Sequence, residues 1–184
     1  MSQTERRWDL LLRLCHWTIV LLVVLQFATA EFGFLDLEWH FYFGYALLGV
    51  LGLRMVWGFI GPPAARFSSS VHGPSALIDY VRRFRQRKSS DYPAHNPLGA
   101  LAAFALWLVL LGQGVSGLLT SDEVMFDGPL VQYFPEWERF ASSWHHQLND
   151  VLLILIALHV VAVAVYYLVK KENLLGPMIH GRRK

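Results

Sequence analysis

The sequence contains a single cysteine, Cys15, among its 184 residues, so it cannot form an internal disulfide. Charged residues are also scarce: they make up 16% of the chain, whereas about a quarter is typical of a soluble domain. Hydrophobic residues account for 54% of the chain, which is too apolar for an ordinary soluble protein. There is no internal repeat and no low-complexity tract, so the length predicts one domain covering residues 1–184.

The hydrophobic residues are gathered into four long segments with very few charges. A hydrocarbon core of roughly 30 Å needs about 20 helical residues at about 1.5 Å each, and every segment is long enough. We expect membrane spans at about 11–30, 40–60, 98–119 and 146–169. The sequence therefore predicts an all-α integral membrane four-helix bundle, with the lipid bilayer as a partner and no nucleic acid.

The first segment has a competing interpretation as a secretory signal peptide. Ala28-Thr29-Ala30 resembles a cleavage site, and basic residues precede the segment. However, Arg13, Cys15 and His16 interrupt the region where a signal peptide should be continuously apolar. We therefore expect this segment to remain as the first span.

Basic residues are concentrated in alternate connecting segments. The N-terminal segment with Arg13, the 61–96 loop and the tail hold fourteen of the sixteen Lys and Arg residues. The other two loops are acidic, with Arg139 as their single basic residue. The positive-inside rule then predicts that both termini are cytoplasmic and that the acidic loops face outward.

The 61–96 loop contains the sequence PSALIDYVRRFRQR, which has the pattern of a short amphipathic helix. We expect it to lie on the membrane surface, with Leu77, Tyr80 and Phe84 facing inward and the arginines toward lipid phosphates.

Histidines inside or beside the spans are the main candidates for a functional site, because ionisable residues are costly in lipid. His145 and His159 are fourteen residues apart, close to four helical turns, so they share one face about 21 Å apart along the axis. Two imidazoles on one face, near opposite membrane surfaces, suit two stacked cofactors better than one. An interfacial histidine and a histidine bonded to a neighbouring helix are the simpler alternative.

With the orientation assigned, each histidine acquires a depth in the membrane. His40 and His145 fall on the outer side, whereas His16 and His159 fall on the inner side. Each pair draws on two different helices, as bis-histidine ligation of a haem between helices requires. The sequence has no CxxCH motif for covalent attachment, so two haems of the b type are expected. A single haem, another metal, or a non-haem metal-binding or transport protein are the alternatives.

Three other residues could belong to the cofactor sites. Arg54 lies fourteen residues after His40 and could pair with a propionate at the inner haem, or extend to the membrane surface. Arg13 has the same two interpretations, with the second favoured. Gly44, one turn after His40, could admit a porphyrin face or another helix.

The remaining histidines are less suited to ligation. His146 faces away from His159 and is the substitute if His145 is not a ligand. We expect His72, His95 and His180, which lie in loops or the tail, to be solvated.

Five stretches carry a family resemblance: RLCHW, HFYFGYALLGVLGLRMVWG, ARFS, HNPLGA and SWHH…ALHVVAV. Through them, and over nearly its whole length, the chain resembles the bacterial cytochrome b561 family, which includes b-type subunits of Ni/Fe hydrogenases. The resemblance implies a bacterial inner-membrane protein with two b haems held by His16, His40, His145 and His159.

The resemblance also implies electron transfer between the quinone pool, ubiquinone or menaquinone, and a periplasmic or membrane-bound partner, such as a c-type cytochrome or an oxidoreductase subunit. Whether the chain is an enzyme stays open, because one branch of the family oxidises superoxide and reduces ubiquinone. The arginine-rich inner loop departs from that branch, and the chain is short for a hydrogenase subunit.

Overall fold

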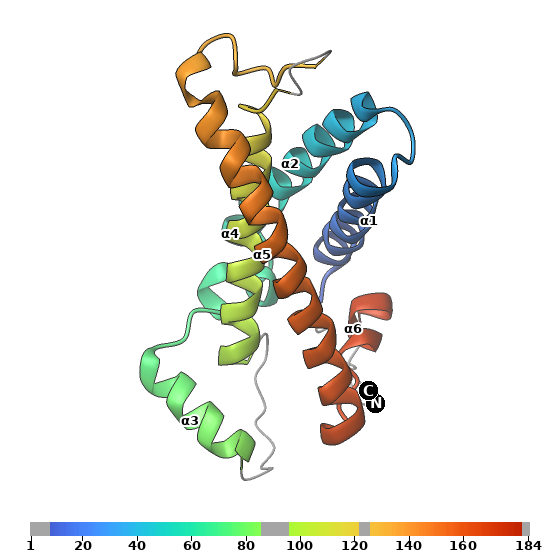
Figure 1. Ribbon diagram of the computed structural model, residues 1–184. Coiled ribbons are helices and arrows are strands. Elements are labelled where there is room, and N and C mark those ends of the chain that lie inside the picture. The colour runs from blue at the N-terminus through green and yellow to red at the C-terminus, as the bar shows by residue number, and fades with distance from the viewer. Residues whose placement is uncertain (1–7, 86–95, 122–125, 182–184) are drawn as a thin grey trace. The chain divides into compact units, whose positions relative to one another are not determined.

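The computed structural model describes residues 8–85, 96–121 and 126–181. In these ranges nearly all secondary structure is helical, and four helices are long and apolar enough to cross a membrane (Figure 1). They are α1 (Leu10–Phe32), α2 (Leu37–Ile60), α4 (Pro97–Gly117) and α5 (Glu138–Val165), which continues as the π-helical segment η4 (Tyr166–Lys170). The shorter elements are η1 (Pro63–Ala65), η2 (Phe67–Ser69), α3 (Pro74–Arg85), η3 (Pro135–Trp137) and α6 (Leu175–His180). The prediction of an all-α membrane protein is confirmed.

Local capping interactions fix where several helices begin. Asp9 Oδ1 accepts a hydrogen bond from the Leu12 amide at 3.0 Å, at the start of α1. Asn96 does the same for Gly99 at 2.8 Å, and Pro97 follows as the first residue of α4, where a proline loses no helical hydrogen bond.

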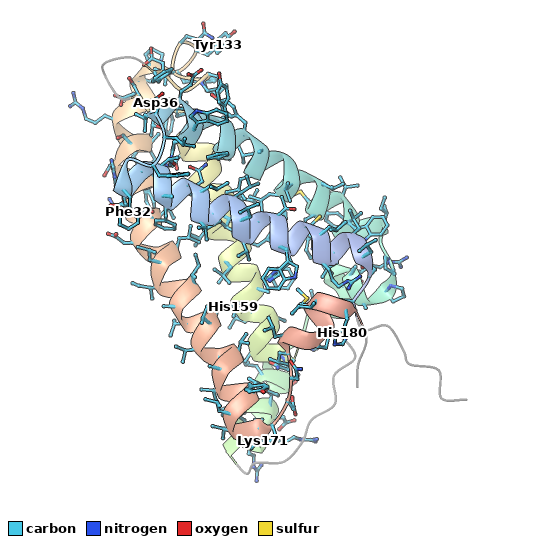
Figure 2. The ribbon with its side chains drawn as sticks, turned by 90° about the vertical axis from the view of Figure 1, so that its right-hand side faces the viewer. Phe32, Asp36, Tyr133, His159, Lys171 and His180 are labelled. Atoms are coloured by element: carbon cyan, nitrogen blue, oxygen red, sulfur yellow. The ribbon has the colours of Figure 1, made fainter. Side chains whose placement is uncertain are left out.

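The helix ends rely on left-handed residues. Gly33, with φ of +60°, follows α1, and the Phe34 amide donates back to the Ala28 carbonyl at 3.0 Å. After this helix end the chain turns between Phe32 and Asp36, which are labelled in Figure 2, and then enters α2. Lys171 adopts φ of +58° after η4, where the Glu172 amide donates to the Tyr166 carbonyl at 3.1 Å.

The observed helices differ from the expected spans mainly at α5. This helix begins at Glu138, eight residues before the expected start of the span at 146. The expectation counted apolar residues, whereas backbone hydrogen bonding continues through the more polar sequence that precedes them. The other three spans agree with the helices to within about three residues, an ordinary uncertainty for helix ends.

The chain divides into two compact units, and the boundaries fall inside the four long helices. The first unit comprises the described residues up to Cys15, Leu53–Ala105 and Ile156–Lys184. Its core contains Trp8, Leu12 and Ala65, against which Trp57 and Met178 pack.

In the first unit, α3 is held through its inward aromatic residues. Tyr80 is only 2% exposed, and the Phe84 ring lies 6.1 Å from that of Tyr166. Lys170 lies over the Phe84 ring at 4.4 Å. Arg82 and Arg83 are exposed, as is the apolar Ile78. The expected helix at residues 74–85 is therefore present, whereas residues 86 and 87 lie outside the described part of the chain.

The second unit comprises His16–Gly52 and Leu106–Leu155. Its buried apolar side chains include Leu22, Leu47, Leu51, Leu110 and Leu152. Many other apolar side chains on the long helices are exposed, for example Leu21, Leu108 and Ile154. Apolar surface of this extent suits contact with lipid, in agreement with the predicted spans.

Candidate functional site

The second unit brings two histidines from different helices close together. His40 lies in the first turn of α2 and His145 lies two turns into α5. Their ring centroids are 6.4 Å apart and their planes are inclined by 77°. Both side chains are half-buried. The two histidines that were expected to pair on the outer side of the membrane are thus close together in the structure.

The hydrogen bonds of His40 determine which ring nitrogen carries the proton. Nδ1 lies 3.2 Å from the Gln26 carbonyl oxygen and 3.2 Å from Thr29 Oγ1, both on α1. A carbonyl can only accept, so Nδ1 carries the proton and donates it. The lone pair of His40 is therefore on Nε2, the atom that binds a metal when Nδ1–H is held in this way.

His145 is held by the same kind of contacts, from α4. Its Nδ1 lies 3.0 Å from the Gln113 carbonyl oxygen and 3.1 Å from Ser116 Oγ. Its Nε2 lies 3.2 Å from the Gln113 side-chain nitrogen, which can only donate. Both rings therefore have the same tautomer, with the lone pair on Nε2.

The separation of the two rings is of the length that one metal ion bound by both imidazoles would need. A metal–imidazole bond is about 2 Å long and a ring nitrogen lies about 1 Å from its centroid, so two rings on one metal would have centroids about 6 Å apart. The centroids of His40 and His145 are 6.4 Å apart. Among the described residues no group of three or more His, Cys, Asp or Glu is placed to hold a metal ion. Two histidines without a third protein ligand would suit a haem, because the porphyrin would supply the remaining iron ligands.

Polar atoms and small residues surround the pair. Among the described residues, the side-chain oxygens of Gln26 and Gln113 are buried without a hydrogen-bond partner. A Cβ at Gly44 would lie 3.0 Å from Gln26 Nε2, and a Cβ at Gly117 would lie 3.1 Å from His145 Cε1. Gly44 thus leaves room beside Gln26, and Gly117 leaves room for the His145 ring.

The other two candidate ligands are described separately, because they belong to different units. His16 lies in the second unit on α1, half-buried, with its ring centroid 5.2 Å from that of Trp17. His159 lies in the first unit toward the end of α5, also half-buried (Figure 2). Their pairing stays a prediction.

Both candidate arginines lie in the first unit. Arg54 donates from Nη2 to the Ala65 carbonyl at 3.1 Å and lies 4.9 Å above the Phe67 ring, but its Nη1 is buried without a partner among the described residues. Arg13 donates from Nη1 to the Ile179 carbonyl at 2.7 Å and from Nε to the Asp9 carbonyl at 3.3 Å. Arg13 therefore fastens the C-terminal helix α6, while Arg54 has an unused donor.

The other histidines vary in exposure. His146 and His180 are exposed, and His72 is half-buried. His95 lies outside the described residues. Cys15 is 3% exposed.

Sequence reasoning missed the residues that hold the two rings: Gln26, Thr29, Gln113 and Ser116. The available signal was a glutamine followed three residues later by a hydroxyl residue in two otherwise apolar helices.

Comparison with known proteins adds an independent finding. A family model described as prokaryotic cytochrome b561 matches residues 7–181. A probable Ni/Fe-hydrogenase B-type cytochrome subunit from Azotobacter chroococcum mcd 1 is 28% identical over 206 aligned residues, which cover 94% of this chain and 85% of that protein. The protein of the same name from Azotobacter vinelandii is 27% identical over 209 residues, with the same coverage. No solved structure matches the chain significantly.

Proposed function

We propose a path for electrons through this chain. The chain belongs to the prokaryotic cytochrome b561 family, so it is a multi-pass membrane b-type cytochrome that takes part in electron transfer. In this proposal the chain binds two b haems and carries electrons between the membrane quinone pool and a redox protein. The observation that carries it is the close approach of His40 and His145, with matching tautomers, in the second unit.

The outer haem is assigned to His40 and His145. Bound there, a b haem supplies the one-electron chemistry of iron. The chain's own contribution is to keep the lone pair of each ring on Nε2, to fix both rings from α1 and α4, and to hold them among apolar helices. The Gln113 amide, which donates to His145 Nε2 in this structure, would have to turn away for that atom to bind iron.

The inner haem is assigned to His16 and His159, on the strength of their depths along α1 and α5. The Nη1 atom of Arg54 is buried without a partner among the described residues, and a guanidinium left without an acceptor in an apolar site is costly. This supports the presence of a carboxylate near Arg54 in the complete protein. A haem propionate would supply that carboxylate. Arg13, whose donors bind the Asp9 and Ile179 carbonyls, is assigned the structural role.

The quinone, ubiquinone or menaquinone, is proposed to enter from the lipid. The redox protein is proposed to be an outer partner, either a hydrogenase, as the names of the two relatives suggest, or a c-type cytochrome. The second unit exposes acidic side chains that suit a basic partner surface: Glu31, Asp36, Glu38, Asp127 and Glu136. We place both termini in the cytoplasm and the chain in a bacterial inner membrane.

A haem count on the purified protein tests the proposal. The dithionite-reduced spectrum should show low-spin b-type bands, and the pyridine haemochrome should give two haems per chain. His159→Ala should remove one haem and leave the other in place. One haem per chain, or loss of neither in the variant, would contradict the two-haem assignment.

A further inference from the structure

The two histidines of the outer pair are held by the same arrangement, built independently on two helices. On α1, the Gln26 carbonyl and the Thr29 hydroxyl contact His40 Nδ1. On α4, the Gln113 carbonyl and the Ser116 hydroxyl contact His145 Nδ1. In both cases the hydroxyl follows the glutamine by three residues, so one helical turn presents two acceptors to one N–H.

We propose that Thr29 and Ser116 are matched positioning residues that set the reduction potential of the outer haem through its two axial histidines. This inference rests on the proposed assignment of His40 and His145 as ligands. It goes further by giving a role to two side chains that would not touch the iron.

The hydroxyls are suited to accept from the rings, because their own protons are directed elsewhere. Thr29 Oγ1 lies 2.9 Å from the carbonyl oxygens of Leu25 and Gln26, which can only accept its proton. Ser116 Oγ lies 3.0 Å from the Gln113 carbonyl oxygen. Each hydroxyl thus donates within its own helix and keeps a lone pair for Nδ1–H.

Burial makes these contacts effective. Thr29 is 4% exposed and Ser116 is 8% exposed, so water competes little for either hydroxyl. An acceptor on Nδ1–H makes the imidazole a stronger electron donor, and stronger donation favours ferric over ferrous iron. Removing a hydroxyl should therefore raise the midpoint potential of this haem and weaken its retention.

The test compares hydroxyl-free variants with variants that keep the hydroxyl. Thr29→Val, Ser116→Ala and their double variant remove the acceptors, whereas Thr29→Ser and Ser116→Thr keep them. Thr120→Val is the matched control, because Thr120 Oγ1 donates to the Gly117 carbonyl at 2.9 Å in the same back-bonded manner, one turn beyond Ser116. Each purified protein is titrated potentiometrically on the reduced b band, and its ferric low-spin signals are recorded by electron paramagnetic resonance.

We expect each hydroxyl-free variant to raise one of two midpoint potentials and to shift the matching ferric signal, leaving the other haem unchanged. The double variant should shift further in the same direction. The hydroxyl-retaining variants and Thr120→Val should match the parent. If a hydroxyl-free variant loses the haem, retention in its hydroxyl-keeping counterpart supports the same role, since outer partners of metal-bound histidines typically contribute about 10- to 100-fold in affinity.

Unchanged potentials in fully loaded Thr29→Val and Ser116→Ala would overturn the inference, as would equal shifts in Thr120→Val. The inference would also be overturned if Thr29→Val or Ser116→Ala lost the haem and the hydroxyl-keeping variant at the same position lost it too. These results differ from a failure of the ligand assignment, in which His40→Ala and His145→Ala would both keep two haems.

Discussion

The imidazole rings of His40 and His145 lie 6.4 Å apart between centroids, although they come from helices far apart in the sequence. His146, the next residue, has its centroid 6.5 Å from that of His145, yet its side chain is exposed. His145 is thus half-buried whereas His146 is exposed, and this difference is why His145 is the expected ligand.

His40→Ala and His145→Ala should each remove one haem per chain, because a bis-histidine site loses an axial ligand in either case. His146→Ala should retain both haems, and it serves as a control that changes the same residue type one position away. The pyridine haemochrome count of the purified variants measures the outcome. Two haems in His145→Ala and one in His146→Ala would reverse the ligand assignment.

The sequence predicted the helices and the approach of His40 to His145, since length and depth depend only on positions along the chain. It could not predict the hydroxyls of Thr29 and Ser116 beside the rings. Which face of α4 meets α5 depends on side-chain packing and not on apolar periodicity, because the spans are hydrophobic all round. The helix α5 also begins at Glu138, before the expected span, because polar residues continue the helix beyond the apolar segment.

Arg54→Gln should lower the midpoint potential of one haem, because loss of a nearby positive charge favours the ferric state. It should also destabilise the protein by about 2 kcal/mol through the lost bond to the Ala65 carbonyl. Arg66→Gln is the matched control: Arg66 Nε donates to the Gly61 carbonyl at 2.7 Å, so a similar bond is lost. Potentiometric titration and thermal unfolding in detergent give both quantities. Equal potentials in the two variants would exclude Arg54 as a propionate partner.

Gly114→Ala should destabilise the protein, whereas Gly52→Ala should not. A Cβ at Gly114 would lie 2.4 Å from Leu48 Cδ2 and 2.8 Å from Leu48 Cγ, so the Leu48 side chain or one of the helices α2 and α4 would have to shift, at a cost of about 1–3 kcal/mol. A Cβ at Gly52 meets no atom within 4 Å, and alanine favours the helix by about 0.5–1 kcal/mol. Thermal unfolding in detergent should therefore shift in opposite directions. Equal stability of the two variants would mean that this contact does not limit helix packing.

The membrane orientation can be tested with introduced thiols, because the native cysteine, Cys15, is only 3% exposed. Glu136 in η3 and Asp79 in α3 are both exposed, and the charge distribution assigns them to opposite sides of the membrane. In spheroplasts, a membrane-impermeant maleimide should label Glu136→Cys directly and Asp79→Cys only after permeabilisation. The parent chain, with Cys15 alone, should stay unlabelled in both conditions. Direct labelling of Asp79→Cys with protection of Glu136→Cys would place the termini outside, and the histidine pair at His40 and His145 would then serve the cytoplasmic side.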